Sequence, residues 1–376
     1  MRILIFLHSF EPGGVERVAI RLCKAWVADG AHVTLILGRG DGAMRGEAGS
    51  LLFQTLSTGR FPTAAWETLW MILRLPGVIR RERPNVLFCA GNSYSIVSVV
   101  MKLFLRRDCP PIVAKISNDL ARADFPPVVR ALYRRWLRIQ ARHIDRFVGM
   151  APPTRDEIAG AMNIDPASVA IIDDPALSMA DIARFGVPRD QRVARTRFVA
   201  AGRLAPQKNF PLLLLAFAKI ARDGDLLTIL GDGPERGKLA ELSQSLGIAG
   251  QVRLVGHVTD IAPEFAEAEI FALSSDYEGV PAVIAEAMAA GLAIVTTDAS
   301  VSMADMLGGH GEIVPTGDLD ALAAALDRSR TVPVDGAAMR RQAERFTIER
   351  AASRYLDVFA GTISQSAPLT PDQKDG

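Results

Sequence analysis

Cysteine and aromatic residues are scarce in this sequence of 376 residues, which contains three cysteines and only 6% Phe, Trp and Tyr. Cys23, Cys89 and Cys109 have no metal-type spacing, and their odd number argues against a disulfide framework. We therefore expect buried free thiols, no metal site and a reducing compartment such as the cytoplasm.

Long apolar runs are also lacking. No uncharged apolar stretch reaches the roughly 18 residues that a membrane-spanning helix needs. The apolar residues Met1 to Leu7 end at His8, after too few residues for a secretory signal, so we interpret them as a buried strand. These observations favour a cytoplasmic protein.

The chain as a whole has no excess of either charge, with a formal net charge of +1, but its halves differ. Residues 1–180 contain 23 Lys and Arg against 16 Asp and Glu, whereas residues 181–376 contain 20 against 26. A basic half often contacts anionic lipid or a phosphorylated ligand. Nucleic acid is a poor candidate for the partner, because stacking aromatics are few and the whole protein is not basic.

Strand-like and helix-like runs alternate along the chain, a pattern typical of parallel sheets covered by helices. Two series of strands are separated by the linker-like segment 173–195, which is rich in Asp, Arg and Pro. We predict two Rossmann-like domains, at residues 1–180 and 190–346, followed by a helix at 349–364 and a disordered tail at 365–376. The predicted strands are Arg2–Leu7, His32–Leu37, Val86–Cys89, Ile112–Ile116, Arg146–Met150, Arg197–Ala201, Leu226–Leu230, Val252–Val255, Ile270–Ala272 and Leu292–Thr296.

The segment from Ser274 to Asp298 says most about function. It begins as a loop with Glu278, after which Pro281 suits the first position of a helix. That helix carries Glu286 about one and a half turns from its start. Free N–H groups at the start of a helix suit a phosphate, and a carboxylate on each side can accept hydrogen bonds from sugar hydroxyls.

Loops after other predicted strands carry cations or glycines. Arg203 and Lys208, five residues apart, can hold a diphosphate and stabilise charge on it as it leaves, which can replace a metal ion. Gly13 and Gly14 follow the first strand and let the backbone approach a ligand closely. The dinucleotide fingerprint Gly-x-Gly-x-x-Gly is absent from this loop, which weakens an oxidoreductase interpretation.

These motifs resemble those of the retaining glycosyltransferases of family 4, whose Glu-x7-Glu signature corresponds to Glu278 and Glu286. The resemblance implies a GT-B fold: α/β, with two Rossmann-like domains facing each other across a cleft. It also implies that the last helix, at 349–364, returns to pack on the first domain. It implies that Glu278 contacts the donor sugar, that Glu286 binds the ribose, and that Arg203 and Lys208 bind the diphosphate, with Glu278, Arg203 and Lys208 as catalytic residues. The donor-binding residues that it implies are Gly13, Gly14, Gly202, Arg203, Lys208, Gly231, Val258, Glu278, Gly279, Val280 and Glu286.

The resemblance further implies a retaining, metal-independent glycosyltransferase without a cofactor. It would move a sugar from a nucleotide-diphosphate sugar, for which we expect a UDP-sugar, to a hydroxyl of a glycan acceptor. We expect that acceptor to be linked to a polyprenyl diphosphate, in bacterial-type synthesis of cell-surface polysaccharide or glycolipid. Two alternatives stay open: a nucleotide-sugar epimerase or phosphorylase on the same fold, and a non-catalytic sugar-nucleotide-binding scaffold.

The chain departs from the family pattern after the fourth strand, where many members have a histidine and this sequence has Ser117, Asn118 and Asp119. Either Asn118 or Asp119 takes over a contact with the sugar or acceptor, or the stretch is only a helix cap. The sequence leaves both interpretations open.

Two segments of the first half combine arginines with aromatic residues. Arg130–Arg146 is predicted to be a helix with six arginines, and Arg80, Arg81 and Arg83 follow Trp66 and Trp70. Such a composition suits a helix lying on anionic lipid, although a packing helix with a solvated basic face has the same pattern. We therefore predict a peripheral protein on the inner face of the cytoplasmic membrane.

Overall fold

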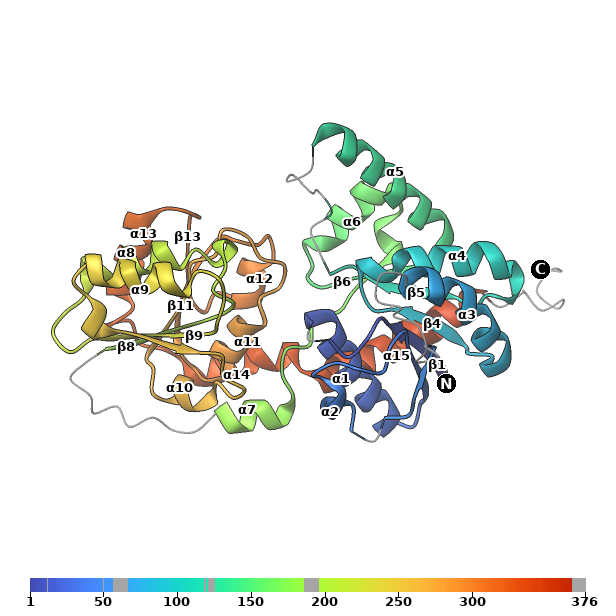
Figure 1. Ribbon diagram of the computed structural model, residues 1–376, viewed down its shortest axis with the longest axis horizontal. Helices are drawn as coiled ribbons and strands as arrows, with labels where there is room; N and C mark the ends of the chain where they lie inside the picture. The colour runs from blue at the N-terminus through green and yellow to red at the C-terminus, as the bar shows by residue number, and fades with distance from the viewer. Residues whose placement is uncertain are drawn as a thin grey trace. The chain divides into compact units, whose positions relative to one another are not determined.

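The computed structural model describes residues 1–11, 13–49, 51–56, 67–117, 120, 126–185 and 196–366 (Figure 1). The chain divides into two compact units, one of Met1–Asp173 with Ile348–Gly376 and the other of Asp174–Thr347. Each unit is built on one parallel sheet with helices packed against it, so the predicted fold class of two Rossmann-like α/β domains is confirmed.

The sheet of the first unit has seven parallel strands in the order β3-β2-β1-β4-β5-β6-β7. All five predicted strands are present, and β3 and β7 add one strand of three residues at each edge. The strands are β1 (Arg2–Leu7), β2 (His32–Leu37), β3 (Phe53–Thr55), β4 (Val86–Cys89), β5 (Ile112–Lys115), β6 (Arg146–Gly149) and β7 (Val169–Ile171).

Helices of the first unit include α1, which packs against α15, and α3, α4 and α5, which pack side by side in chain order. The predicted last helix is α15, and it belongs to the core of this unit: the Trp26 Nε1 donates a hydrogen bond of 3.1 Å to the Ala352 carbonyl. The described helices are α1 (Gly14–Ala28), α2 (Arg45–Ala48), α3 (Glu67–Glu82), α4 (Ser95–Leu105), α5 (Pro127–His143), α6 (Thr154–Met162) and α15 (Ile348–Ser366).

The second unit has a six-stranded parallel sheet in the order β10-β9-β8-β11-β12-β13. Its five predicted strands are present within one residue at either end, and the short edge strand β13 is additional. The strands are β8 (Arg197–Ala201), β9 (Leu226–Leu230), β10 (Val252–Gly256), β11 (Ile270–Leu273), β12 (Ala293–Thr297) and β13 (Glu312–Val314).

The predicted linker 173–195 does not remain a linker throughout. Its described part contains helix α7 (Met179–Phe185), in which Ile182 and Phe185 are buried in a core of the second unit. The boundary between units therefore falls after Asp173 rather than near residue 180. The other described helices of this unit are α8 (Phe210–Ile220), α9 (Arg236–Ser245), α10 (Ala262–Ala266), α11 (Ala282–Ala289), α12 (Met303–Leu307), α13 (Leu319–Arg328) and α14 (Gly336–Ala343).

Two predicted element ends are displaced. The basic helix predicted at Arg130–Arg146 is α5, which ends at His143 because Arg146 already pairs with Val113 as the first residue of β6. The last helix continues to Ser366, so the first two residues of the predicted tail are helical, and residues 367–376 lie outside the described residues. Over the described parts of the chain, no helix is both long and apolar enough to cross a membrane.

Candidate active site

Most of the predicted donor-binding residues lie on loops that follow β8, β9, β10 and β11 of the second unit. Because the strands are parallel, these loops all leave the sheet at its carboxyl-terminal edge, where ligands of such sheets bind. Contacts link them in turn: Glu278 contacts Lys208, Lys208 lies against Gly202, and Gly202 lies against Gly231. Three of these loops, after β8, β9 and β11, are thus brought together on one edge of one sheet.

An ion pair between Lys208 and Glu278 is at the centre of this edge. The Lys208 Nζ lies 2.5 Å from Glu278 Oε1, and the side chains are only 17% and 8% exposed. The Ser275 hydroxyl donates a second hydrogen bond, of 2.6 Å, to the same oxygen. The backbone N–H of Glu278 donates to the Ala299 carbonyl at 2.7 Å, which fixes the loop itself. The carboxylate is therefore held in one orientation.

The loop that carries Lys208 is tied to the loop after β11 at three further places. Gln207 Nε2 donates to the Tyr277 carbonyl at 2.8 Å, and the Ser274 hydroxyl donates to the Lys208 carbonyl at 3.0 Å. Asn209 caps α8 with its side chain and donates to Asp276 at 2.7 Å. These bonds join residues that are 66 to 70 positions apart in sequence and make the two loops a single structure.

Gly231 is required by the close approach of two loops. Its φ of +133° is unfavourable for other residues, and a Cβ there would lie 1.9 Å from the Gly202 carbonyl oxygen. The Gly231 N–H donates to the Gly256 carbonyl at 2.8 Å, which ties in the loop of Val258. Val258 is half-buried against the core, whereas the adjacent His257 is exposed.

Arg203 and the start of α11 complete the positive side of the site. The Arg203 side chain is exposed, and none of the described residues pairs with it. Helix α11 follows Pro281, which caps the helix instead of occupying its predicted first position. No side chain caps its first turn, so the N–H groups there can meet an anion. Glu286, half-buried, is the fifth residue of this helix.

Gly13 and Gly14 lie in the first unit, at the carboxyl-terminal edge of its sheet. Gly13 caps α1, and a Cβ on it would lie 2.1 Å from Oε2 of Glu16. The other oxygen of Glu16 accepts a 2.7 Å hydrogen bond from the buried Tyr94 hydroxyl. Close by, burial lowers the pKa of His8, despite the nearby Glu67 and Glu16 carboxylates.

Two features fall outside this arrangement. Asn118 and Asp119, the predicted sugar or acceptor contacts, lie outside the described residues, as does Trp66.

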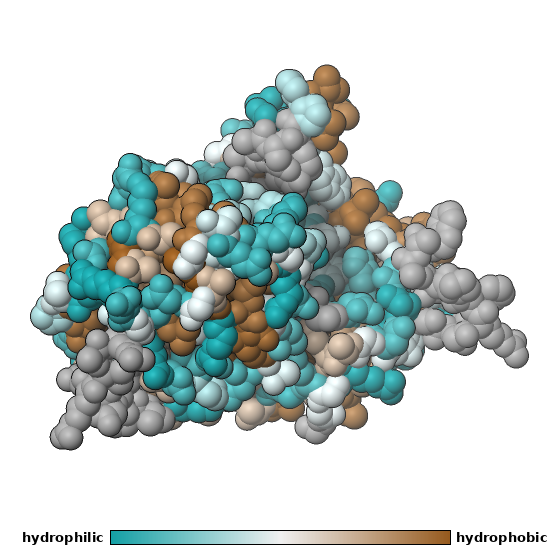
Figure 2. All heavy atoms as spheres, turned by 60° about the vertical axis from the view of Figure 1, so that its left-hand side comes forward, coloured by the Kyte–Doolittle hydropathy of each residue, from teal (hydrophilic) through white to brown (hydrophobic). Residues whose placement is uncertain are grey.

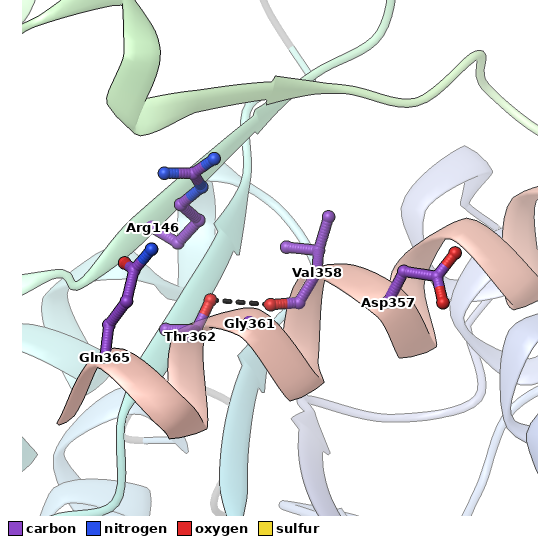
Figure 3. Close-up of a pocket in the computed structure, with 6 residues that line it drawn as sticks. All are labelled: Arg146, Asp357, Val358, Gly361, Thr362 and Gln365. Carbon is purple, nitrogen blue, oxygen red and sulfur yellow. Dashed lines mark hydrogen bonds between the residues drawn. The ribbon is translucent and has the colours of Figure 1, made fainter. Parts of the chain in front are cut away.

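A cavity of about 240 Å³ opens in the first unit between the start of β6 and α15, at the edge opposite to Gly13 (Figure 3). A cation, a carboxylate and an amide line it together, which indicates no particular class of ligand. The lining residues are Arg146, Asp357, Val358, Gly361, Thr362 and Gln365.

Ser275 was not predicted from the sequence. It contacts the carboxylate of Glu278 directly, and its only local signal is a hydroxyl three residues before that glutamate in the loop. Serine is common in loops, so the residue type alone indicates nothing.

A parallel sheet in each of two units is the architecture of the GT-B class, and comparison with known proteins shows that the chain is a glycosyltransferase of this class. Residues 12–174 match the model of Glycosyltransferase Family 4 and residues 195–329 that of Glycosyl transferases group 1. The chain belongs to glycosyltransferase family 4, as the sequence motifs predicted.

Three similar proteins illustrate the membership of this family. The chain is 31% identical to the phosphatidyl-myo-inositol mannosyltransferase of Mycolicibacterium smegmatis, over 87% of this chain and 84% of that protein. It is 26% identical to the lipopolysaccharide core biosynthesis glycosyltransferase LpsE of Rhizobium meliloti, over 94% and 97%. Anabaena Alr3699/HepE, solved in complex with UDP and glucose, shares the fold with a TM-score of 0.72 and 18% identity, over 96% of this chain and all of that one.

Proposed function

We propose that this glycosyltransferase is a retaining, metal-independent enzyme that takes its sugar from a nucleotide-diphosphate sugar. The observation that carries the proposal is the Lys208–Glu278 pair, beside the exposed Arg203 and the uncapped start of α11. Three positive groups and one buried carboxylate match the two parts of such a donor, a diphosphate and a hydroxyl-bearing sugar.

Each group has a role that follows from its chemistry. Arg203 offers a planar fork of N–H donors to the diphosphate, and Lys208 offers a point charge. As the bond from the sugar C1 to the phosphate oxygen breaks, both cations stabilise the charge that develops on the leaving diphosphate. Glu278 accepts a hydrogen bond from a sugar hydroxyl, and Glu286 accepts from the ribose. Gly202, Gly231, Gly279 and Val280 offer backbone groups to the phosphates, and Val258 lies beside the nucleobase.

The proposed transfer takes place on one face of the sugar. The acceptor hydroxyl oxygen forms the new bond to C1 on the face from which the nucleoside diphosphate departs. Its proton moves to the departing phosphate oxygen, so atoms and charge balance and the anomeric configuration is retained. We favour UDP as the nucleotide, which the complex of the similar HepE fold with UDP and glucose supports.

The acceptor is proposed to be a lipid-linked glycan. Relatives that match most of the chain are described as acting in lipopolysaccharide core biosynthesis and on phosphatidyl-myo-inositol, and both acceptors are attached to lipid. In this chain, Gly13 and Gly14 at the carboxyl-terminal edge of the first sheet would face the substrates.

Three neighbouring helices of the first unit support a location on the membrane surface. Exposed apolar side chains occur on α3, α4 and α5, which pack side by side; we call this set the apolar ridge, and Figure 2 shows such residues at the projecting end of α5. Exposed arginines of α5 accompany it, including Arg134, Arg135 and Arg138. Apolar groups that enter the lipid boundary, with cations near anionic head groups, bind a membrane surface. The apolar ridge consists of Leu69, Leu73, Ile96, Leu103, Phe104, Val128, Val129 and Leu132.

A panel of nucleotide sugars tests the donor assignment. The correct donor should raise the melting temperature, because a bound ligand stabilises the folded state by mass action. Transfer should continue in EDTA, and the product should keep the anomeric configuration of the donor in an NMR spectrum. Loss of activity with chelator and its recovery with Mg²⁺ would exclude the metal-independent mechanism, and binding of UDP-sugars without any transfer or hydrolysis would favour a scaffold.

Vesicle co-sedimentation tests the location. Changing Arg134, Arg135 and Arg138 to Glu should release the protein from vesicles with anionic lipid, since each cation contributes about 1 kcal/mol near such a surface. Donor affinity should not change. The matched control also changes three cations to Glu: Arg17, Lys24 and Arg45, which are exposed on α1 and α2. Equal sedimentation of both triple variants would argue against a lipid-binding face on α5.

A further inference from the structure

Ser275 has no role in the predicted site, yet it is completely buried beneath it. It lies two residues after β11, and its hydroxyl donates a 2.6 Å hydrogen bond to Glu278 Oε1. A hydroxyl that donates to a carboxylate forms a charge-assisted hydrogen bond, which is stronger than a neutral one and more specific in direction. Ser275 therefore restrains the side chain that is proposed to meet the sugar.

The two oxygens of Glu278 have different surroundings. Oε1 accepts from both the Ser275 hydroxyl and the Lys208 Nζ, at 2.6 and 2.5 Å. No described residue donates to Oε2. A carboxylate has about four lone-pair positions, so Oε2 keeps its capacity to accept while Oε1 is occupied by two donors.

Ser275 is itself held by the next strand. The buried Thr297 hydroxyl, at the end of β12, donates to the Ser275 carbonyl at 2.6 Å. The N–H of Glu278 is bound to Ala299, two residues beyond that threonine. The loop is thus fixed at Ser275 to the end of β12 and at Glu278 to the segment that follows it, which restrains both partners of the Ser275–Glu278 hydrogen bond.

We propose that Ser275 is a positioning residue of the transfer reaction: together with Lys208 it occupies Oε1 of Glu278 and thereby directs Oε2 to a hydroxyl of the donor sugar. This inference rests on the proposed function. Without the serine hydroxyl, the carboxylate can rotate about its last bond and follow Lys208 alone. A reacting group that is misplaced in this way loses much of its effect, because the advantage of a bound substrate depends on orientation.

The test compares the affinity for UDP with that for UDP-glucose in the variant Ser275→Ala. UDP lacks the sugar, so its affinity should stay within twofold of the parent. Affinity for UDP-glucose and the rate of its hydrolysis or transfer should fall by about tenfold or more, as expected for loss of a hydrogen bond to a charged group. Ser275→Cys keeps a weak donor at the same position, in a slightly larger side chain, and should recover part of the loss.

Ser243→Ala is the matched control, because Ser243 is also buried in the second unit but donates only to the Ala240 carbonyl within α9. Equal losses for UDP and UDP-glucose in Ser275→Ala would mean a merely structural role and would overturn the inference. Parental values for both ligands and for turnover would overturn it as well. The parent protein separates this inference from the proposed function. If it binds UDP-glucose no better than UDP and GDP-mannose no better than GDP, and turns over neither sugar donor, the result counts against the proposed function, whatever the variants do.

Discussion

Two ion pairs of the second unit, both largely shielded from solvent, lie at opposite edges of the same sheet and differ in how completely their hydrogen-bonding groups are used. Arg330 and Asp225, at the amino-terminal edge, are 5% and 4% exposed. Arg330 donates to both oxygens of Asp225, to Asp327 and to the Ile220 carbonyl, and it lies over the ring of Phe198 at 4.9 Å. Every nitrogen of its guanidinium has a partner.

The pair at the carboxyl-terminal edge, Lys208 with Glu278, leaves Oε2 of the carboxylate without a donor among the described residues. Oε2 is not among the buried side-chain atoms that lack a partner, so it stays accessible and can accept a hydrogen bond from a ligand. The comparison teaches that burial alone does not identify a functional ion pair. The Arg330–Asp225 pair, which we call the saturated pair because all its guanidinium nitrogens have partners, fits a structural role, and the incompletely used pair fits the donor site that we propose.

Breaking the saturated pair should give the largest effect. Asp225→Ala removes the partner of a buried guanidinium and two acceptors for the N–H groups of Thr196 and Arg222. We expect a loss of about 3–5 kcal/mol in the free energy of unfolding, with UDP affinity unchanged below the melting temperature. Differential scanning fluorimetry and titration with UDP measure both. Asp320→Ala, whose exposed carboxylate pairs with Lys219, is the control and should barely change stability.

Glu278→Gln, at the carboxyl-terminal edge, should reduce turnover strongly and stability little, the opposite of Asp225→Ala. The amide keeps the shape of the side chain but loses the charge that pairs with Lys208 and accepts the sugar hydroxyl. We expect turnover to fall on the order of 100-fold, while the melting temperature falls less than in Asp225→Ala. Near-parental turnover would place the reacting site elsewhere in the chain.

The sequence placed the residues of this edge on the correct loops because its motifs are local. Glu278, Pro281 and Glu286 lie within nine positions, and ten strands were found within one residue at either end, because each is a short, mainly apolar run. The strands β3, β7 and β13 were missed, since each has three residues and pairs on one side only.

Contacts between distant positions explain the other omissions. Arg330 is 105 positions from Asp225, and its neighbours in sequence do not indicate that it is buried. Likewise, nothing near Ser275 distinguishes its hydroxyl from that of Ser274, which donates to a different loop. Saturation of an ion pair is a property of three-dimensional packing, so the distinction between the two pairs requires the structure.

Arg203→Ala should sharpen the comparison, because this arginine is the extreme case of an unpaired cation. It is exposed and has no partner within the described part of the chain, so its removal should leave stability unchanged. We expect UDP affinity to fall about tenfold, from the loss of charge-assisted hydrogen bonds to phosphate. Isothermal titration measures the affinity. Arg328→Ala, an exposed arginine that pairs with Glu312, is the control, and an equal effect there would indicate only a general influence of charge.

Lowering the pH should gradually reduce the stability that the saturated pair contributes, by less than the substitution Asp225→Ala does. Burial by itself raises the pKa of Asp225, but hydrogen bonds from Arg330 and from the N–H groups of Arg222 and Thr196 outweigh it, so the pKa lies below its ordinary value. A carboxyl group whose pKa is lower in the folded state stabilises that state above its unfolded pKa of about 3.9. The stabilisation is lost as the pH falls through the folded pKa.

The stability difference between the parent and Asp225→Ala isolates this contribution, because all other titrating groups are common to both proteins. Urea unfolding midpoints at pH 7, 5, 4 and 3 should give a constant difference from pH 7 to 5 and a shrinking one below about pH 4. A difference that stays constant down to pH 3 would mean that the Asp225 charge contributes nothing beyond packing. The amino-terminal pair would then hold the fold by shape alone, and only the pair at the active edge would depend on its charge.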